Sequence, residues 1–323
     1  MGTFADNVNG AKDPVKILLL GDTGAGKTGS LVSLLTQGYK LFIIDTDKGI
    51  KPLKTLALNP NYPYKALMDK KKIDPFKNVH FESISTDMGL RTVKDGDSVV
   101  KILAPKDAKA WSKIVDLLAD WTDSETKEKF GPIDSWDQDC VLIVDSFSAM
   151  ARFCYYFSQQ LNGRLGARDE GYTYMRDVNA AQAQLTRFLE LISNDRVRCN
   201  VIIITHITWI VDDKGYAENP RGNIEKDNGE AQIQKDPKGL PMAIGRAIAP
   251  YIGTKFNDSF TVKQTGSGAS VRREILTVPM DGVSAKNSSY VKRSYPVSTG
   301  LAEIFAAIRG EPEPKDLMDL FKR

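Results

Sequence analysis

The chain has 323 residues, enough to bury a large core as one domain or two. Its composition, 41% hydrophobic and 26% charged, is that of an ordinary globular protein. A formal net charge of +3 is too small to identify a nucleic-acid-binding protein, so any basic surface must be local.

The cysteines, the histidines and the N-terminal residues indicate where in the cell the protein is located and whether it holds a metal. Three widely separated cysteines form no pair with metal-ligand spacing, and their odd number favours a reducing compartment. Two histidines, His80 and His206, are too few for a histidine-rich metal centre. Residues 1–16 lack the apolar stretch of a secretory signal, and no apolar run is long enough to span a membrane. We therefore expect a cytoplasmic protein without a membrane partner.

In the first two thirds of the chain, apolar runs alternate with segments of helical periodicity. Residues 15–20 (VKILLL), bounded by Pro14 and Gly21, are typical of a buried strand. Residues 27–37 have helical character, and Gly38 ends that helix. Further strands are predicted at 40–45, 79–85, 140–145 and 200–206, helices at 48–57, 107–122, 147–160 and 174–194, and a surface hairpin at 91–103.

The last third has a different pattern. Residues 212–238 are polar with almost no apolar periodicity, a helix is predicted at 241–252, and more exposed strands at 258–264, 271–278 and 290–295. Uniformly apolar strands alternating with helices predict an α/β fold, with a mostly parallel sheet covered on both faces. The late strands, joined by short turns, predict an antiparallel extension at one edge. We expect an N-terminal arm at 1–14, one core domain at 15–308 and a polar tail at 309–323.

Between the first strand and the first helix lies GDTGAGKT, residues 21–28, which matches G-x-x-x-x-G-K-[ST] without a gap and is called the P-loop below. Its glycines let backbone N–H groups turn toward phosphate oxygens, and the following helix adds its positive dipole end. Lys27 is expected to reach the β- and γ-phosphates, and Thr28 to hold Mg²⁺. The predicted cofactors are therefore ATP and Mg²⁺. The residues expected to bind the nucleotide are Gly21, Asp22, Thr23, Gly24, Ala25, Gly26, Lys27, Thr28 and Gly29.

Polar side chains end three of the other strands. Asp145 closes CVLIVD and is expected to ligate Mg²⁺ together with Thr28, because ligands gather at the carboxyl ends of parallel strands. In FIIDTDKG, Asp47 is the candidate for activating water, and Asp45 is expected to pack against the loop. His206, which closes VIIITH, is expected to sense the γ-phosphate. Each acid has a helix-capping role as its alternative, and the histidine a purely structural one.

The order of these elements, and VDSFSAM in particular, resembles the RecA family of ATPases from about residue 15 to about residue 300. The segment REILTVPMDGVSAKNSS is similar to the Lys-Asn stretch of RecA-like ring ATPases, and the layout to phage-encoded annealing or recombination ATPases. The resemblance implies that Asp47 replaces a catalytic glutamate with a shorter carboxylate, and that His206 stands at the position of a glutamine sensor. It also implies that Lys286 reaches into a neighbouring subunit's site. Competing candidates for that last role are Arg272, Arg273 and Arg293.

Single-stranded DNA is the partner that the resemblance implies, bound by two loops. The first is LNGRLGARDEG, and the second is residues 208–240. The last 30 residues of the second loop hold five basic and seven acidic side chains, a net charge of −2, although DNA phosphates attract positive charge. Residues 261–293 hold six basic and two acidic side chains, a net charge of +4, with Tyr290 available for base stacking. The expected DNA contacts are Arg164, Arg168, Arg272 and Arg273.

The sequence thus predicts an ATPase that assembles into a ring or filament with ATP at subunit interfaces. It would act on single-stranded DNA in phage-type recombination, annealing or replication, in the host cytoplasm if phage-encoded. One alternative is a hexameric helicase or motor on the same core. Another, favoured by the acidic second loop, is a nucleotide-gated assembly protein that binds no nucleic acid. In the tail, Leu317, Leu320 and Phe321 share one helical face, which either docks a partner or packs on its own domain.

Overall fold

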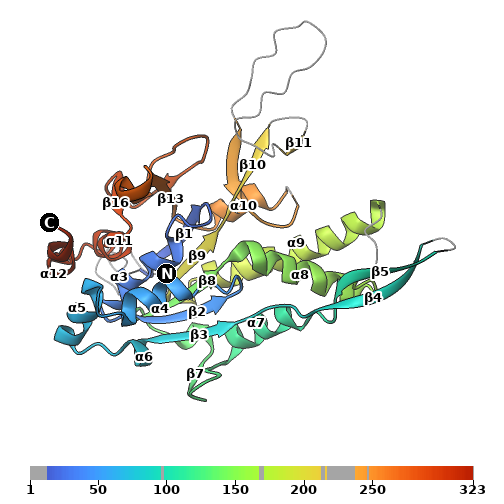
Figure 1. Ribbon diagram of the computed structural model, residues 1–323, viewed down its shortest axis with the longest axis horizontal. Coiled ribbons are helices and arrows are strands. Elements are labelled where there is room, and N and C mark those ends of the chain that lie inside the picture. Colours follow the sequence, from blue (N-terminus) through green and yellow to red (C-terminus); the bar gives the residue numbers. More distant parts are fainter. Residues whose placement is uncertain are drawn as a thin grey trace, which may run out of the picture.

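The structure, a computed structural model, describes residues 13–95, 98–166, 171–211, 215–216, 237–245 and 247–322. Its centre is a nine-stranded sheet in the order β16-β14-β13-β1-β9-β8-β2-β3, with β15 paired to β13 (Figure 1). The parallel strands are β1 (Lys16–Gly21), β2 (Lys40–Asp45), β3 (Val79–Ser83), β8 (Cys140–Asp145), β9 (Asn200–Thr205) and β13 (Asp258–Thr265).

Three short strands are added antiparallel at the β13 edge. They are β14 (Arg272–Leu276), β15 (Lys286–Asn287) and β16 (Ser294–Pro296), called the antiparallel extension below. The predicted fold class is therefore confirmed: an α/β protein with a mostly parallel central sheet, flanking helices and an antiparallel edge.

Helices cover both faces of the sheet. On one side lie α7 (Lys109–Ala119), α8 (Phe147–Leu161), α9 (Gly171–Ser193) and the short α10 (Ala249–Thr254). On the other lie α2 (Lys27–Ser30), α3 (Val32–Leu35), α4 (Lys51–Leu58), α5 (Pro63–Lys71), α11 (Gly300–Ile308) and α12 (Lys315–Met318). Single-turn elements are α6 (Pro75–Asn78), η1 (Ile133–Ser135), η2 (Gly268–Ser270) and η3 (Asp319–Phe321).

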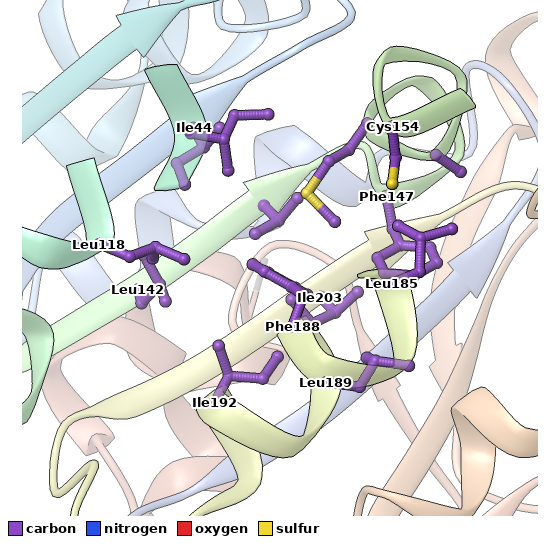
Figure 2. Close-up of a cluster of buried hydrophobic side chains, with 14 of the residues drawn as sticks. Ile44, Leu118, Leu142, Phe147, Cys154, Leu185, Phe188, Leu189, Ile192 and Ile203 are labelled. Atoms are coloured by element: carbon purple, nitrogen blue, oxygen red, sulfur yellow. The ribbon is translucent and has the colours of Figure 1, made fainter. Parts of the chain in front are cut away.

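Two cores explain why the buried strands are apolar at every position. Successive side chains of a strand point to opposite faces, so both sets must be apolar when both faces are covered. Leu142 and Ile203 pack with α8 and α9 in the core shown in Figure 2, where Phe188 and Leu189 lie over the sheet. Ile143 and Ile202, one residue away, belong to the core on the other face. Each such side chain contributes about 1.5–3 kcal/mol by its burial.

Three smaller sheets lie outside the central one. β4 (Met88–Asp95) and β5 (Ser98–Pro105) form the predicted surface hairpin, which extends away from the body (Figure 1). β6 (Trp121–Thr122) pairs with β7 (Lys129–Gly131), and β10 (Ile207–Val211) pairs with β11 (Gly215–Tyr216) and β12 (Lys238–Pro241).

Several predicted elements differ in the structure. The helix expected at 241–252 begins only at Ala249, because Lys238–Pro241 pairs with β10 as a strand. The last strand was expected at 290–295 and spans Ser294–Pro296 instead. The helix at Gly300–Ile308, buried along most of its length, had no predicted counterpart. The predicted arm, apart from residues 13 and 14, and most of the polar stretch at 212–238 lie outside the described residues.

The C-terminal tail packs on its own domain. Leu317 is fully buried in the same core as α5 and α11, and Leu320 packs against that core. The Phe321 ring lies 5.3 Å from the Tyr64 ring, and Lys71 pairs with Asp316 at 2.6 Å. Of the two possibilities left open by the sequence, the structure therefore shows intramolecular packing. In the part of the chain that the structure describes, no helix is both long and apolar enough for a membrane crossing.

Candidate functional site

A cavity of about 850 Å³ opens where the P-loop meets the carboxyl ends of β2, β8 and β9. One group of lining residues comes from the P-loop and the strand ends: Thr23, Gly24, Gly26, Lys27, Thr28, Gly29, Asp47, Asp145 and His206. A second group comes from α4 and the residues before it, the start of α5 and the residue before it, and the antiparallel edge: Lys48, Gly49, Lys51, Pro52, Thr55, Leu56, Tyr62, Tyr64, Arg273, Val297 and Ser298. The cavity therefore has both a charged and an apolar wall.

The P-loop backbone needs glycine at particular positions. Gly24 and Gly26 have φ values of +82° and +105°, which side chains rarely allow. At Gly21, a Cβ atom would lie 2.6 Å from the Val262 carbonyl oxygen of the neighbouring strand β13. The loop can therefore turn tightly over the end of β1 while β13 stays close beside it.

Lys27 lies over this loop. Its Nζ donates to the carbonyl oxygens of Gly21 at 2.7 Å and Asp22 at 2.9 Å, and the residue is only 7% exposed. Burial lowers its pKa, which the carboxylates of Asp145, Asp22 and Asp47 partly counteract. A buried ammonium held by carbonyl oxygens alone is suited to binding an anion that enters the cavity.

Thr28 and Asp145 meet directly. Thr28 Oγ1 donates a short hydrogen bond to Asp145 Oδ2, and Asp145 is 5% exposed. Burial raises the Asp145 pKa to about 6; Asp45 and Asp47 raise it too, while Thr28 and Lys27 lower it. Gly49 keeps the space beside the pair open, because its absent Cβ would lie 3.8 Å from Thr28 Oγ1 and 3.9 Å from Asp145 Oδ2.

The same pair fits a magnesium ion. Mg²⁺ prefers hard oxygen ligands and takes only one or two from the protein, with the rest from water and phosphate. A carboxylate and a hydroxyl beside an open glycine meet that need, and a cation there would offset the cost of burying Asp145. No cluster of three or more His, Cys, Asp or Glu side chains suited to a metal occurs among the described residues.

Asp47 and His206 also come together, although 159 residues separate them. His206 Nε2 lies 3.2 Å from Asp47 Oδ2, and Ser146 Oγ donates to the same oxygen. Burial alone would raise the Asp47 pKa, but the hydrogen bonds from His206 and Ser146, together with the charges of His206 and Lys27, lower it overall. The His206 N–H in turn donates to Ser148 Oγ at 3.0 Å, which fixes the backbone beside the cavity.

Asp45 and Ser146 have structural contacts. Asp45 Oδ1 accepts from the Gly49 N–H at 2.8 Å and its Oδ2 from Ser83 Oγ at 3.0 Å, so its hydrogen bonds join the segment after β2 to the end of β3 and not to the P-loop. Ser146 caps α8 through Ala149, while Asp145 faces Thr28.

Other predicted residues lie away from this cavity. Lys286 Nζ donates to the Phe256 carbonyl oxygen at 2.7 Å, and Lys286 pairs with Ser259 near the start of β13, far from the P-loop end of that strand. Neither Lys286 nor Arg293 lines the cavity of its own chain. A contact of either with a neighbouring subunit therefore stays a prediction.

The structure describes three of the four predicted DNA contacts. Arg164 Nε donates to Asp177 Oδ2 at 3.1 Å and its Nη2 to Oδ1, so this arginine joins the end of α8 to α9 as part of the fold. Arg272 is exposed on β14, whereas Arg273 lines the cavity. Arg168 lies outside the described residues. Of the three that the structure describes, Arg164 therefore lies between α8 and α9, whereas Arg272 and Arg273 lie on β14.

The apolar wall of the cavity, formed by Leu56, Tyr62 and Tyr64, was not predicted from the sequence. Tyr64 Oη donates to the Ser298 carbonyl oxygen at 3.0 Å, which joins the start of α5 to the segment after β16 across 234 residues. Leu56 and Tyr62 complete the wall. No local signal links these segments. Among the charged lining residues, Lys48 and Lys51 could have been found, because they follow Asp47 by one and four residues in the sequence.

Comparisons with known proteins give a distant structural likeness. No protein-family model and no curated protein matches the chain. Among solved structures, it is similar to a KaiC-like protein of the archaeon Pyrococcus horikoshii OT3 (9% identity, 90% of this chain and 89% of that one, TM-score 0.37). It is also similar to the RadB recombinase (14%, 84% of each chain, 0.34) and to the flagellar accessory protein FlaH of Methanocaldococcus jannaschii (10%, 85% and 84%, 0.35). Likeness at this level says nothing about function, which has to be inferred from the site.

Proposed function

We propose that this protein is a RecA-like ATPase that binds Mg-ATP in the cavity and hydrolyses it to ADP and phosphate. The observation that carries the proposal is the contact between Thr28 and Asp145 beside the buried ammonium of Lys27. These groups come from the start of α2 and the end of β8, and their chemistry matches a metal-bound triphosphate.

Each residue has a role that follows from its contacts. The P-loop backbone binds the phosphates, and Lys27 moves its hydrogen bonds from the Gly21 and Asp22 carbonyls to phosphate oxygens. Thr28 and Asp145 would hold Mg²⁺, which would supply positive charge to offset that of the phosphates. Asp47 accepts a proton from the attacking water, while His206 and Ser146 fix the orientation of its carboxylate.

Phosphate release from Mg-ATP tests this proposal. We expect Lys27→Ala and Asp145→Asn each to lower the rate by about 10²-fold or more, since each removes charge stabilisation at the phosphates. Lys40→Ala is the control, because Lys40 is exposed at the opposite end of β2 from Asp45. Failure of the wild-type protein to bind ATP at millimolar concentration would overturn the proposal.

We further propose single-stranded DNA as the partner, in recombination, annealing or replication of the phage type. The support is Tyr290, which is 93% exposed in a turn beside Lys292 and Arg293. Asn287 holds that turn through hydrogen bonds with Val291, so the aromatic ring is presented on a fixed backbone. Exposed aromatic rings among cations stack on the bases of single strands.

Binding of a labelled oligothymidine at several salt concentrations, with and without ATP, tests this second proposal. Tyr290→Ala should weaken binding roughly fivefold or more, since stacking contributes about 1–3 kcal/mol per base. An absence of binding under all conditions would favour the assembly protein without nucleic acid. Unwinding of a forked duplex would favour the helicase. Sedimentation of the protein with and without ATP would measure the ring or filament that we propose as its working state.

A further inference from the structure

Arg273 occupies a position in the fold that its predicted role in DNA binding does not explain. Along β14, side chains alternate between the two faces of the sheet. Arg273 lies on the same face as Ile275, which is fully buried in the core under α3 and α11. Arg272 and Glu274 point to the other face. Arg273 therefore continues a core-facing row of side chains out to the rim of the cavity.

The Arg273 side chain lies against the P-loop of its own chain. A Cβ atom on Gly26 would lie 3.1 Å from Arg273 Cδ, 3.9 Å from Arg273 Nε and 3.2 Å from Val297 Cγ1. Gly26 has no side chain, so the arginine can pass directly over the loop. The cross-strand partner Gln264 fixes its direction, because Arg273 Nε donates to Gln264 Oε1 at 2.9 Å.

The far end of this guanidinium is available for a ligand. Within the described ranges, neither Nη atom of Arg273 has a hydrogen-bond or ion-pair partner, in contrast to Arg164 with its buried carboxylate. Guanidinium groups bind phosphate oxygens with two parallel N–H donors. A cation with two unpartnered terminal nitrogens, fixed beside a loop of phosphate-binding type, is therefore suited to a phosphate of the bound nucleotide.

We propose that Arg273 is a nucleotide contact supplied by the chain's own antiparallel extension, and neither a DNA contact nor a finger that acts on a neighbouring subunit. The inference rests on the proposed nucleotide binding and deepens it. The Arg273 side chain lies beside Gly26 and its carbonyl oxygen accepts from the Val297 N–H at 3.0 Å, whereas the water-activating candidates Asp47 and His206 lie with Ser146 at the ends of other strands. It therefore binds the part of the nucleotide that ADP and ATP share, and contributes to affinity rather than to cleavage.

Titration of the full-length protein with Mg-ADP and Mg-ATP, followed by phosphate release, tests this inference. We expect Arg273→Gln to weaken both affinities about tenfold, while kcat at saturating ATP changes less than twofold. The matched control is Lys263→Gln, which removes a cation from the adjoining strand; Lys263 pairs with Asp281, and its affinities should stay within twofold of the wild type. Arg273→Lys should recover only part of the loss, because one ammonium cannot replace two parallel donors.

The outcomes separate the alternatives. Unchanged ADP affinity in Arg273→Gln, with wild type and control binding normally, would overturn the inference and leave the proposed ATPase intact. Loss of kcat alone would indicate a finger, and loss of oligonucleotide binding alone a DNA contact; each would overturn the inference too. If wild type and control both failed to bind nucleotide, the proposed function itself would be wrong. Arg273 is exposed, so thermal unfolding should confirm that the variant folds.

Discussion

The two sides of the central sheet contribute to the cavity by different physical routes. On the parallel side, made of β3, β2, β8, β9 and β1, the acids and Lys27 stand at a strand end or in the segment that follows it, as Asp145, Asp47 and Lys27 do. On the antiparallel extension, Arg273 is the second residue of its strand, and Val297 follows β16. Strand direction alone gathers the first group at one edge. The second group reaches the cavity only because the pairing register aligns Arg273 with Gln264.

Arg164 and Arg273 were both predicted to bind DNA but have different surroundings. The largest effect on stability is expected for Arg164. Asp177 is 1% exposed and accepts two hydrogen bonds from Arg164. Arg164→Ala should lower the free energy of unfolding by about 3–5 kcal/mol, because it leaves a buried carboxylate without its cation. Urea denaturation measures this, with the exposed Arg152→Ala as control. An unchanged midpoint would mean that the pair of Arg164 with Asp177 does not stabilise the fold.

Loss of the buried tail contact should have the next largest effect. Leu317 is fully buried between the tail and α5. Leu317→Ala should cost about 2–4 kcal/mol of stability, because it removes buried methyl groups and leaves a cavity. Leu161→Ala, 67% exposed at the end of α8, is the control in the same denaturation experiment. Equal stability of the two variants would show that the tail does not hold the domain together.

A substitution at Gly21 tests how closely strands β1 and β13 approach each other. A methyl group there meets the Val262 carbonyl oxygen at 2.6 Å, so β1 and β13 must move apart. Gly21→Ala should destabilise the protein by about 2 kcal/mol. In Gly253→Ala, by contrast, the new Cβ meets nothing within 4 Å inside helix α10, and we expect no loss. Thermal unfolding that shifts equally in both variants would contradict the close approach of the strands.

The smallest expected effect concerns pH. Hydrogen bonds from His206 and Ser146 hold the Asp47 pKa below its ordinary value. His206→Ala removes one of them, so the Asp47 pKa should rise and the acid limb of the kcat profile should move to higher pH. The shift should be less than about one unit, because Ser146 still donates. An unmoved acid limb, with activity intact, would mean that another group accepts the proton.

The local pattern of apolar residues was sufficient to predict the strands on the parallel side of the sheet. The apolar runs at 15–20, 40–45 and 140–145 predicted strands whose observed bounds differ by one residue at most. Burial on both faces demands such runs whatever the partner strands are. At 238–254 the same reasoning failed, because pairing of Lys238–Pro241 with β10 overrides the local helical pattern. The helix at Gly300–Ile308 was missed because it is apolar around most of its circumference and shows no simple stripe.

The candidate site divides in the same way. Its charged wall was predicted residue by residue, from the P-loop to Asp145, Asp47 and His206, and the structure brings these side chains into one cavity. Its apolar wall was not predicted, because Tyr64 and Ser298 meet across 234 residues without any motif.

By itself, the sequence determined the P-loop, the buried strands and the polar residues that end them. These features need only local geometry and the rule that parallel strands end at one edge. Tertiary structure alone decided the roles open to the arginines: Arg164 faces a buried carboxylate, whereas Arg273 lies over Gly26. A charged side chain is equally compatible with a surface, an ion pair or a ligand until packing fixes which groups surround it. That packing depends on strand register and on segments hundreds of residues apart.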